Sequence, residues 1–229
     1  MYASICRSMI KAVFFDLDGT LVEFKLDVRG SKAEVLSLIR SVAPGVKGLN
    51  ETCSYYSMLD KVRKSVDSKT YERIQGSAYA ILDRYEMEAA KETSLREGAL
   101  DVLKYLRISG KKIALLTNSG RRAVGLILER FDIEKYFDKV LTRDELSSMK
   151  PSPEGICLLL NLFGLKPDEC VTVGDGAIDI IPSRTVGLKS IIVAGGYGPF
   201  RKVLEQKPDY LIQSLSDLPN LLELLETSL

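Results

Sequence analysis

The stretch from residue 12 to residue 22 reads AVFFDLDGTLV, and the interpretation of the whole chain begins there. Its first four residues are apolar and fit a buried strand, which stops at Asp16. Asp18 follows before a Gly-Thr turn, so both carboxylates are expected at the carboxyl edge of a sheet, where open α/β proteins bind ligands. Asp and Gly are also ordinary turn residues, so the stretch alone leaves a plain strand-to-turn junction open.

The composition is typical of a water-soluble globular protein. The chain has 229 residues, of which 45% are hydrophobic and 28% are charged, and its net charge is +1. This length suits one large domain or one domain that carries a smaller insert. The balanced charge predicts no nucleic-acid partner, and the lack of a long apolar run predicts no membrane partner.

The cysteines are scattered, and no two of them form a Cys-x-x-Cys pair. This pattern favours reduced thiols and a cytoplasmic location over a zinc site or a disulfide framework. Residues 1–9 hold one arginine and no long apolar core, which argues against a signal peptide, and Met9 is an alternative start. The four cysteines are Cys6, Cys53, Cys157 and Cys170.

The chain contains no histidine. This excludes Ser-His-Asp and Cys-His catalysis, histidine-zinc hydrolysis and every mechanism that needs an imidazole base. Any chemistry must therefore use carboxylates, lysine, hydroxyl groups and backbone amides.

Two regions with different periodicity follow the first strand. Residues 32–90 show only helical periodicity, and residues 97–229 alternate between helices and strands. The alternation predicts a mostly parallel sheet covered on both faces, and the helical insert predicts a lid domain. Helices are expected near residues 32–40, 52–66, 70–90, 97–109, 121–131, 153–163, 177–186 and 217–226, and strands near 113–116, 139–142, 171–173, 190–193 and 210–212.

Three of the predicted strands end in polar loops, and a fourth loop carries a lysine. Parallel strands with right-handed crossovers end at one edge of the sheet, so we expect these loops to converge. Singly, each loop has a simpler interpretation, such as a helix cap, a solvent-exposed lysine or acidic residues favoured at a helix N-terminus. The polar residues are Asp16, Asp18, Thr117, Asn118, Lys150, Asp175 and Asp179.

These residue types are chemically consistent with one another. Clustered carboxylates from Asp16, Asp175 and Asp179 favour a hard cation, and Mg²⁺ suits carboxylates, a carbonyl and a substrate phosphate. A lysine with hydroxyl and amide donors suits the oxygens of a phosphoryl group. One aspartate can then attack phosphorus to form an aspartyl-phosphate, and a second can act as acid and base.

Taken in this order, the segments resemble the four motifs of the haloacid dehalogenase superfamily, in its phosphatase branch. The resemblance covers essentially the whole chain. It implies an α/β fold with a three-layer, Rossmann-like, mostly parallel sheet in residues 1–22 and 95–229. It also implies an inserted all-helical cap domain in residues 23–94 that closes over the substrate. The matching segments are DLDGT at 16–20, LTN at 116–118, KPSP at 150–153, VGDGAID at 173–179 and PDYLI at 208–212.

The resemblance also implies a role for each polar residue. Asp16 is the expected nucleophile and a metal ligand. Asp18 is the expected general acid and base, and it lends its backbone carbonyl to the metal. The remaining implied roles are phosphate binding by Thr117, Asn118 and Lys150, Mg²⁺ ligation by Asp175, and support of the metal shell by Asp179.

Two segments depart from the pattern of this branch. Glu23-Phe24 stands where Asp-Ser is common, and Leu95-Arg96-Glu97 stands where a Pro-rich segment is usual before Gly98. Both segments lie at the expected hinges to the cap. They leave the core chemistry intact but argue against transferring a substrate from close relatives.

The leading hypothesis is a cytoplasmic, Mg²⁺-dependent phosphatase that hydrolyses a small-molecule phosphate monoester through an aspartyl-phosphate. Phosphoglycolate or a sugar phosphate is the implied class of substrate, and a monomer or a weak homodimer is expected. A phosphomutase is the main alternative, although similar helical-cap mutases have a hinge histidine that this chain lacks. Dehalogenase and phosphonate-cleaving branches lack the acid found here at Asp18. A non-catalytic binding protein on the same scaffold is the remaining alternative.

Overall fold

The computed structural model describes residues 9–227. Cys6 and the expectations for a signal peptide and for the start of the chain lie outside this range. The described chain forms two compact units. We call residues 9–24, 94–118 and 128–227 the sheet unit, and residues 25–93 and 119–127 the helical unit. The division into a core of residues 1–22 and 95–229 and a cap of residues 23–94 stays a prediction.

The sheet unit is built on a six-stranded sheet in the order β3-β2-β1-β4-β5-β6, and every neighbouring pair is parallel. Phe15 of β1 pairs with Leu115 of β2 and with Val173 of β4, so β1 ends between the ends of these two strands. The predicted α/β fold with a mostly parallel sheet is confirmed. The strands are β1 Ala12–Phe15, β2 Lys112–Leu116, β3 Lys139–Leu141, β4 Cys170–Gly174, β5 Lys189–Val193 and β6 Tyr210–Ile212.

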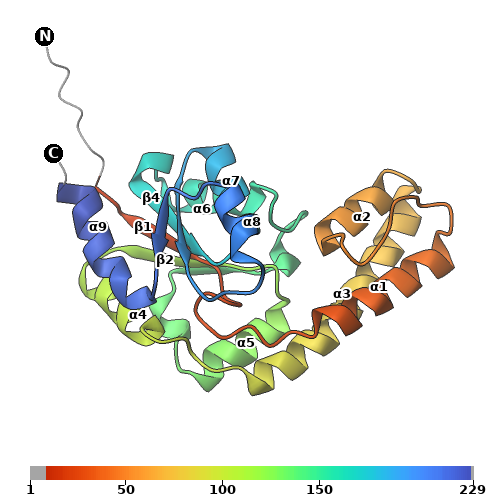
Figure 1. Ribbon diagram of the computed structural model, residues 1–229, viewed down its shortest axis with the longest axis horizontal. Helices are drawn as coiled ribbons and strands as arrows, with labels where there is room; N and C mark the ends of the chain where they lie inside the picture. Colours follow the sequence, from red (N-terminus) through yellow and green to blue (C-terminus); the bar gives the residue numbers. More distant parts are fainter. Residues whose placement is uncertain (1–8, 228–229) are drawn as a thin grey trace, which may run out of the picture. The chain divides into compact units, whose positions relative to one another are not determined.

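Helices cover both faces of this sheet, which gives three layers (Figure 1). Helices α6 and α7 pack on one face, and α4 and α9 pack on the other. Phe14 points to the α6 side and joins a core cluster with Leu116 and Ile156. Because side chains alternate along a strand, Val13 and Phe15 point to the opposite face, and all of β1 is buried. The helices are α4 Ala99–Ile108, α6 Glu154–Phe163, α7 Ala177–Val186, α8 Phe200–Glu205 and α9 Leu218–Thr227.

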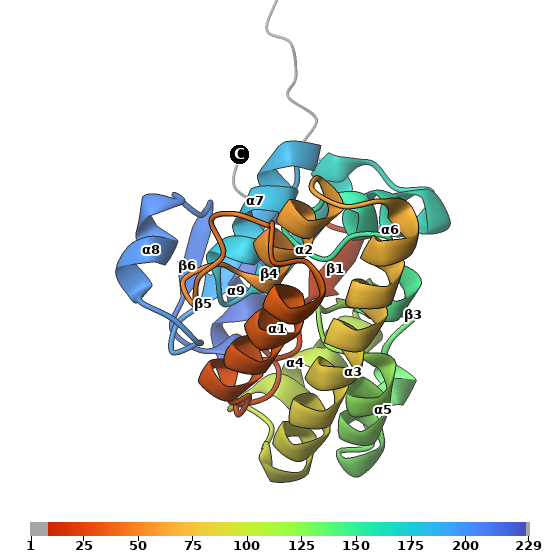
Figure 2. The ribbon, with the colours of Figure 1, turned by 90° about the vertical axis from the view of Figure 1, so that its right-hand side faces the viewer.

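The helical unit consists of three helices and the first part of a fourth. Helices α1 and α3 run side by side (Figure 2). Their facing stripes are apolar, and Leu36 and Ile39 of α1 and Ile74 and Leu82 of α3 are buried. The helices are α1 Val28–Val42, α2 Tyr55–Arg63, α3 Ser68–Glu92 and α5 Arg121–Arg130.

Local capping explains where the helix boundaries differ from the predicted ones. Helix α1 begins at Val28 because the Asp27 side chain accepts a hydrogen bond from the Gly30 backbone N–H. Helix α2 begins only at Tyr55 because the Ser54 side chain caps it in the same way. The short helix α8 was not predicted, since six residues after a Gly-rich loop carry too little periodicity.

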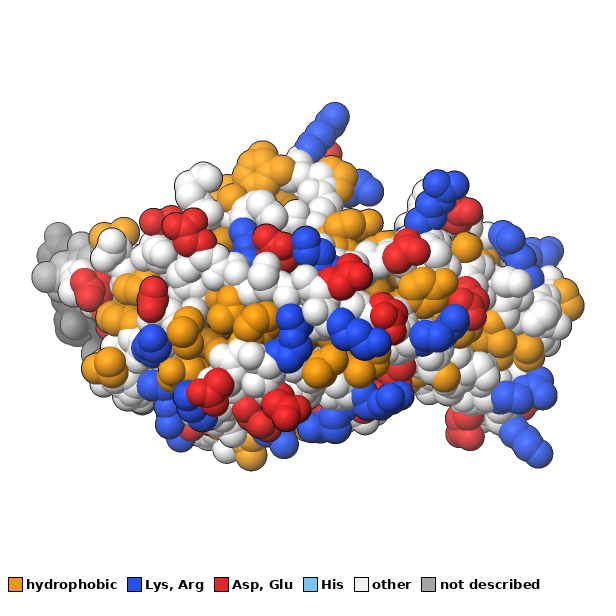
Figure 3. Space-filling view, turned by 90° about the horizontal axis from the view of Figure 1, so that it is seen from below, with side chains coloured by type: hydrophobic (Ala, Val, Ile, Leu, Met, Phe, Trp, Pro, Cys, Tyr) orange, Lys and Arg blue, Asp and Glu red, His pale blue; other side chains and the backbone are white. Residues whose placement is uncertain are grey.

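The surface is mixed in charge. On the face drawn in Figure 3, basic and acidic side chains are interspersed with apolar ones. Within residues 9–227, no helix has both the length and the apolar character needed to cross a membrane. The described cysteines, Cys53, Cys157 and Cys170, are free thiols.

Candidate active site

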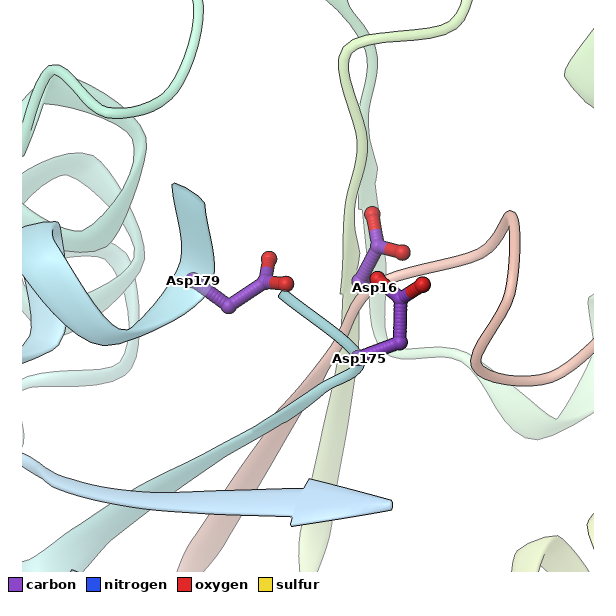
Figure 4. Close-up of side chains that lie close together, drawn as sticks. All are labelled: Asp16, Asp175 and Asp179. Carbon is purple, nitrogen blue, oxygen red and sulfur yellow. The ribbon is translucent and has the colours of Figure 1, made fainter. Parts of the chain in front are cut away.

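Three carboxylates meet at the carboxyl edge of the sheet. Asp16 directly follows β1, Asp175 directly follows β4, and Asp179 lies in the first turn of α7. One oxygen of each side chain lies within 4.8 Å of the others (Figure 4). The exposed fractions of the three residues are 7%, 9% and 5%. The sequence-based expectation that these loops converge therefore agrees with the geometry.

Lys150 enters this cluster from the loop before α6. Its Nζ donates to Oδ1 of Asp16 at 2.7 Å and to Oδ1 of Asp179 at 2.6 Å. The residue is only 4% exposed, so both ion pairs are buried. One ammonium group thus faces three carboxylates, which leaves the cluster with an excess of negative charge.

The pKa values reflect this imbalance. Burial raises the pKa of Asp16 to about 7, the Asp179 and Asp18 carboxylates add to the rise, and Lys150 opposes it. Burial, followed by the charges of Asp16 and Asp179, raises the pKa of Asp175 to about 8. Burial alone would lower the pKa of Lys150, but its two carboxylate partners outweigh that effect and raise it. The lysine therefore stays protonated, and Asp16 and Asp175 need further positive charge to stay ionised at neutral pH.

A divalent cation fits this cluster. The donors are carboxylate oxygens, which are the ligands that Mg²⁺ prefers, and they are close enough together to share one ion. A bound divalent cation would offset the excess of negative charge that raises the pKa values of Asp16 and Asp175. The acidic cluster could therefore hold a metal ion.

Backbone atoms pack tightly around Asp175. Its Oδ2 accepts a hydrogen bond of 2.7 Å from the Tyr197 backbone N–H. A Cβ at Gly19, whose φ is +86°, would lie 2.3 Å from Asp175 Oδ2, and a Cβ at Gly196 would lie 2.2 Å from it. Glycine is therefore needed at both positions for the chain to approach this carboxylate.

A similar close approach occurs at Asp179. A Cβ at Gly174 would lie 2.3 Å from the Asp179 Cγ. The Asp179 Oδ2 also accepts a hydrogen bond of 3.2 Å from the Gly176 backbone N–H. The glycines of the fourth motif thus hold this carboxylate against the end of β4.

Asp18 lies beside the cluster rather than inside it. It is half-buried, and its backbone bridges to Val22 across the turn that follows β1. This turn is closed by the Leu17 carbonyl, which accepts from the N–H groups of Thr20 and Leu21 at 3.2 and 2.9 Å. Asp18 is near enough to raise the pKa of Asp16, so the second carboxylate of the motif borders the same site.

The loop after β2 reaches the site through Asn118. Its side chain accepts from the Lys150 backbone N–H at 2.8 Å and donates to the Lys150 carbonyl at 3.0 Å. These contacts fasten the loop that carries Lys150. Thr117 precedes Asn118 at the end of β2 and is 1% exposed. Phosphate binding by Thr117, Asn118 and Lys150 stays a prediction.

Two residues of the site were not singled out from the sequence. The Thr20 hydroxyl donates to Asp16 Oδ2 at 3.3 Å, and the signal for it was its place in the DLDGT segment. Arg143 is fully buried and donates from Nη1 to the Asn118 carbonyl at 3.1 Å. No motif marks Arg143, because a contact to a backbone carbonyl leaves no pattern in the sequence.

This fold and this cluster of carboxylates and lysine define a class of hydrolase. The family model of the haloacid dehalogenase-like hydrolases matches residues 10–187 of the sequence. The chain therefore belongs to that family. The chain is 26% identical over 212 residues to phosphoglycolate phosphatase 1 of Pseudomonas aeruginosa, with 91% of this chain and 78% of that protein covered. It is 29% identical over 209 residues to a Caldanaerobacter subterraneus protein provisionally named pyrophosphatase PpaX, with 91% and 93% covered.

Solved structures agree on the fold. A hydrolase from Pseudomonas syringae superimposes with a TM-score of 0.69 at 20% identity, with 93% of this chain and 98% of that chain covered. At this identity the likeness shows the fold alone. The expected membership in the superfamily, on the side of its phosphatases, is confirmed by the family match and the relatives. The chain is therefore an enzyme.

Proposed function

We propose that this enzyme is a Mg²⁺-dependent phosphatase that hydrolyses a small-molecule phosphate monoester through an aspartyl-phosphate on Asp16. The observation that carries the proposal is the buried contact of Asp16 with Lys150, beside the carboxylates of Asp175 and Asp179. The family match and the relatives named phosphoglycolate phosphatase support it.

Asp16 is the proposed nucleophile. Lys150 holds its Oδ1 and the Thr20 hydroxyl contacts its Oδ2, which orients the carboxylate at the end of β1. A carboxylate oxygen attacks phosphorus, the bond from phosphorus to the leaving oxygen breaks, and an aspartyl-phosphate forms. Water then attacks this intermediate, releases inorganic phosphate and restores the Asp16 carboxylate.

Asp18 is the proposed acid and base. It gives a proton to the leaving oxygen in the first step and takes one from the attacking water in the second. Its half-buried position next to Asp16 suits a group that must reach the substrate oxygen. This pair of roles requires the residue to be protonated when the leaving group departs.

Mg²⁺ would be held by the carboxylates of Asp16 and Asp175 and by the backbone carbonyl of Asp18. When bound, the cation supplies the positive charge that lets a negatively charged phosphate approach carboxylates. Asp179, which contacts Lys150 and the Gly176 N–H, supports this arrangement rather than the phosphate. Lys150, Thr117 and Asn118 are the proposed phosphate-binding residues.

The relatives and the helical unit bear on the substrate class. The names of the relatives support phosphoglycolate, and the relative provisionally named pyrophosphatase allows a phosphoanhydride. A sugar phosphate stays a prediction from the resemblance. We propose that the helical unit, as the cap, selects the substrate, because the residues of the cluster can touch only its phosphate. A cytoplasmic location and a monomer or weak homodimer stay predictions, as does the lack of nucleic-acid and membrane partners.

The test is release of inorganic phosphate from an aryl phosphate, with and without Mg²⁺. Release that requires Mg²⁺ and disappears in Asp16→Asn is expected, because the amide cannot act as the nucleophile while the side-chain volume is kept. Arg201→Met, a change at an exposed side chain of α8, is the matched control and should keep full activity. No metal-dependent release would refute the proposal. Conversion of a sugar 1-phosphate into an isomer without free phosphate would indicate the phosphomutase instead.

A further inference from the structure

Glu23-Phe24 and Leu95-Arg96-Glu97, the two segments that depart from the sequence pattern of this branch, pair with each other in the sheet unit. The Glu23 N–H donates to the Ser94 carbonyl at 2.9 Å, and the Arg96 N–H donates to the Leu21 carbonyl at 2.9 Å. Residues 22 and 95 form an antiparallel bridge between these two contacts. The paired segments line a cavity of about 470 Å³ together with the loop after β5.

The guanidinium group of Arg96 links two loops within this unit. Its Nη1 donates to the Gly19 carbonyl and its Nη2 donates to the Ala194 carbonyl. Gly19 belongs to the turn after β1, and Ala194 directly follows β5. A Cβ at Gly195 would lie 3.2 Å from Nη2, so this glycine leaves room for the side chain.

An aromatic pair makes a second connection nearby. The rings of Phe24 and Tyr197 stack with centroids 4.1 Å apart and an angle of 17° between their planes. Phe24 follows the turn after β1, and Tyr197 lies in the loop after β5. The stack therefore joins the same two loops as Arg96 does. One of its two rings, that of Phe24, belongs to the Glu23-Phe24 segment, which also departs from the sequence pattern of the branch.

These two loops enclose Asp175. Gly19 approaches its carboxylate from the turn after β1, and Gly196 approaches it from the loop after β5. The Tyr197 N–H donates to it directly at 2.7 Å. The separation of the two loops therefore sets the space in which the Asp175 carboxylate can turn.

We propose that Arg96 and the Phe24–Tyr197 stack are positioning groups that hold the two loops against Asp175 and thereby fix its orientation for Mg²⁺. This inference rests on the proposed function, which makes Asp175 a metal ligand. Neither group is a ligand itself. Each acts through the backbone of Gly19 or of residues 194–197, as supporting groups around metal sites commonly do.

Arginine suits this position better than lysine. Its planar group carries several N–H donors in a fixed arrangement, so it can reach two carbonyls at once, whereas an ammonium group is a point charge on a flexible stem. Arg96→Lys should therefore keep only part of the positioning that the two arginine contacts provide. Arg96→Met should lose both contacts while keeping an apolar stem in the cavity.

The first experiment measures Mg²⁺ binding to the enzyme without substrate, by calorimetry. Arg96→Met should raise the Kd for Mg²⁺ by roughly 10- to 100-fold, the range found for supporting groups of metal sites, and Arg96→Lys should give an intermediate value. Arg201→Met is the matched control, because Arg201 lies in α8 and contacts Glu205 instead. Saturating Mg²⁺ should restore kcat of Arg96→Met, which a damaged catalytic group would not permit.

The aromatic pair provides an independent test that does not depend on how well Arg96→Met folds. Tyr197→Phe keeps the stack and should bind Mg²⁺ like the wild type, whereas Tyr197→Leu should weaken binding. Unchanged Kd values in Arg96→Met and Tyr197→Leu would overturn this inference and leave the proposed function standing. A lower Tm of these two variants in EDTA, with an unchanged Kd for Mg²⁺, would also overturn this inference, because it would show a purely structural role. A wild-type enzyme that neither binds Mg²⁺ nor releases phosphate would overturn the proposed function itself.

Discussion

Replacing Lys150 with methionine tests how the buried cluster is balanced. Methionine keeps a long apolar side chain but removes the ammonium group that Asp16 and Asp179 contact at 2.7 and 2.6 Å. Removing one partner of a buried ion pair costs about 3–5 kcal/mol, because it leaves the other charge in a poorly hydrated place. For a domain of this size, 1 kcal/mol shifts Tm by about 2–4 °C, so the expected loss in EDTA is roughly 6–20 °C.

The effect should depend on pH in a defined direction. The pKa of Asp16 is already raised to about 7, and the loss of Lys150 should raise it further. Acid therefore neutralises the uncompensated carboxylate, and the difference in Tm between variant and wild type should shrink from about pH 9 to about pH 5. Thermal melts followed by circular dichroism across this range are the assay.

A matched control separates this effect from the loss of any lysine. Lys112→Met removes an ammonium that is paired with Asp138 but is 54% exposed. An exposed pair of this kind contributes about 0–1 kcal/mol, so the control should melt close to the wild type. A loss in Lys150→Met as small as in Lys112→Met, or one that does not change with pH, would refute the reasoning about the cluster.

Mg²⁺ at about one hundred times its Kd should stabilise the wild type by about 2.7 kcal/mol in thermal melts, and Asp175→Asn should abolish this shift. Gly196→Ala should weaken Mg²⁺ binding in calorimetry and lower phosphate release, because the new Cβ would lie 2.2 Å from Asp175 Oδ2. The control Gly125→Ala has open space around its Cβ and should leave both Mg²⁺ binding and phosphate release unchanged. In EDTA, denaturant titrations should give a free energy of unfolding that falls as pH rises from about 4 to about 8. The pKa values of Asp16 and Asp175 are raised to about 7 and about 8, so the folded state binds more protons than the unfolded state in this range. Mg²⁺ should reduce that slope, and a stability that rises over the same range would contradict the raised values.

Most of the strands were predictable because they are short, mainly apolar runs that end in turn residues. The run before Asp16 is buried at all four positions, as a central parallel strand must be. The helix ends were less predictable, since they depend on single capping contacts such as that of Asp27 with the Gly30 N–H. Helix α8 could not be predicted, because its six residues are too few to show a period.

The candidate site also contains residues that the sequence predicted and supporting residues that it did not. Asp16 and Asp175 follow strands, Lys150 lies in a loop, and Asp179 lies in the first turn of the helix after β4. A parallel sheet brings these segments to one edge, so the order of the four residues along the chain was enough to group them. The supporting residues act through backbone atoms of distant segments, and no spacing rule connects such partners. Arg96 was singled out only because it breaks a pattern, and its contact with the Ala194 carbonyl comes from the fold alone.

The arrangement of charge in the cluster is asymmetric, and this argues for where a cation belongs. The single ammonium of Lys150 lies between Asp16 and Asp179 and offsets part of their negative charge. Asp175 instead accepts from the neutral Tyr197 N–H, and its pKa is raised to about 8. Positive charge is therefore most deficient between Asp175 and Asp16, the two carboxylates proposed as Mg²⁺ ligands. A second lysine at this place would add positive charge but could not coordinate a phosphate oxygen. A divalent cation held by Asp16 and Asp175 would supply the charge and could also take a phosphate oxygen as a ligand.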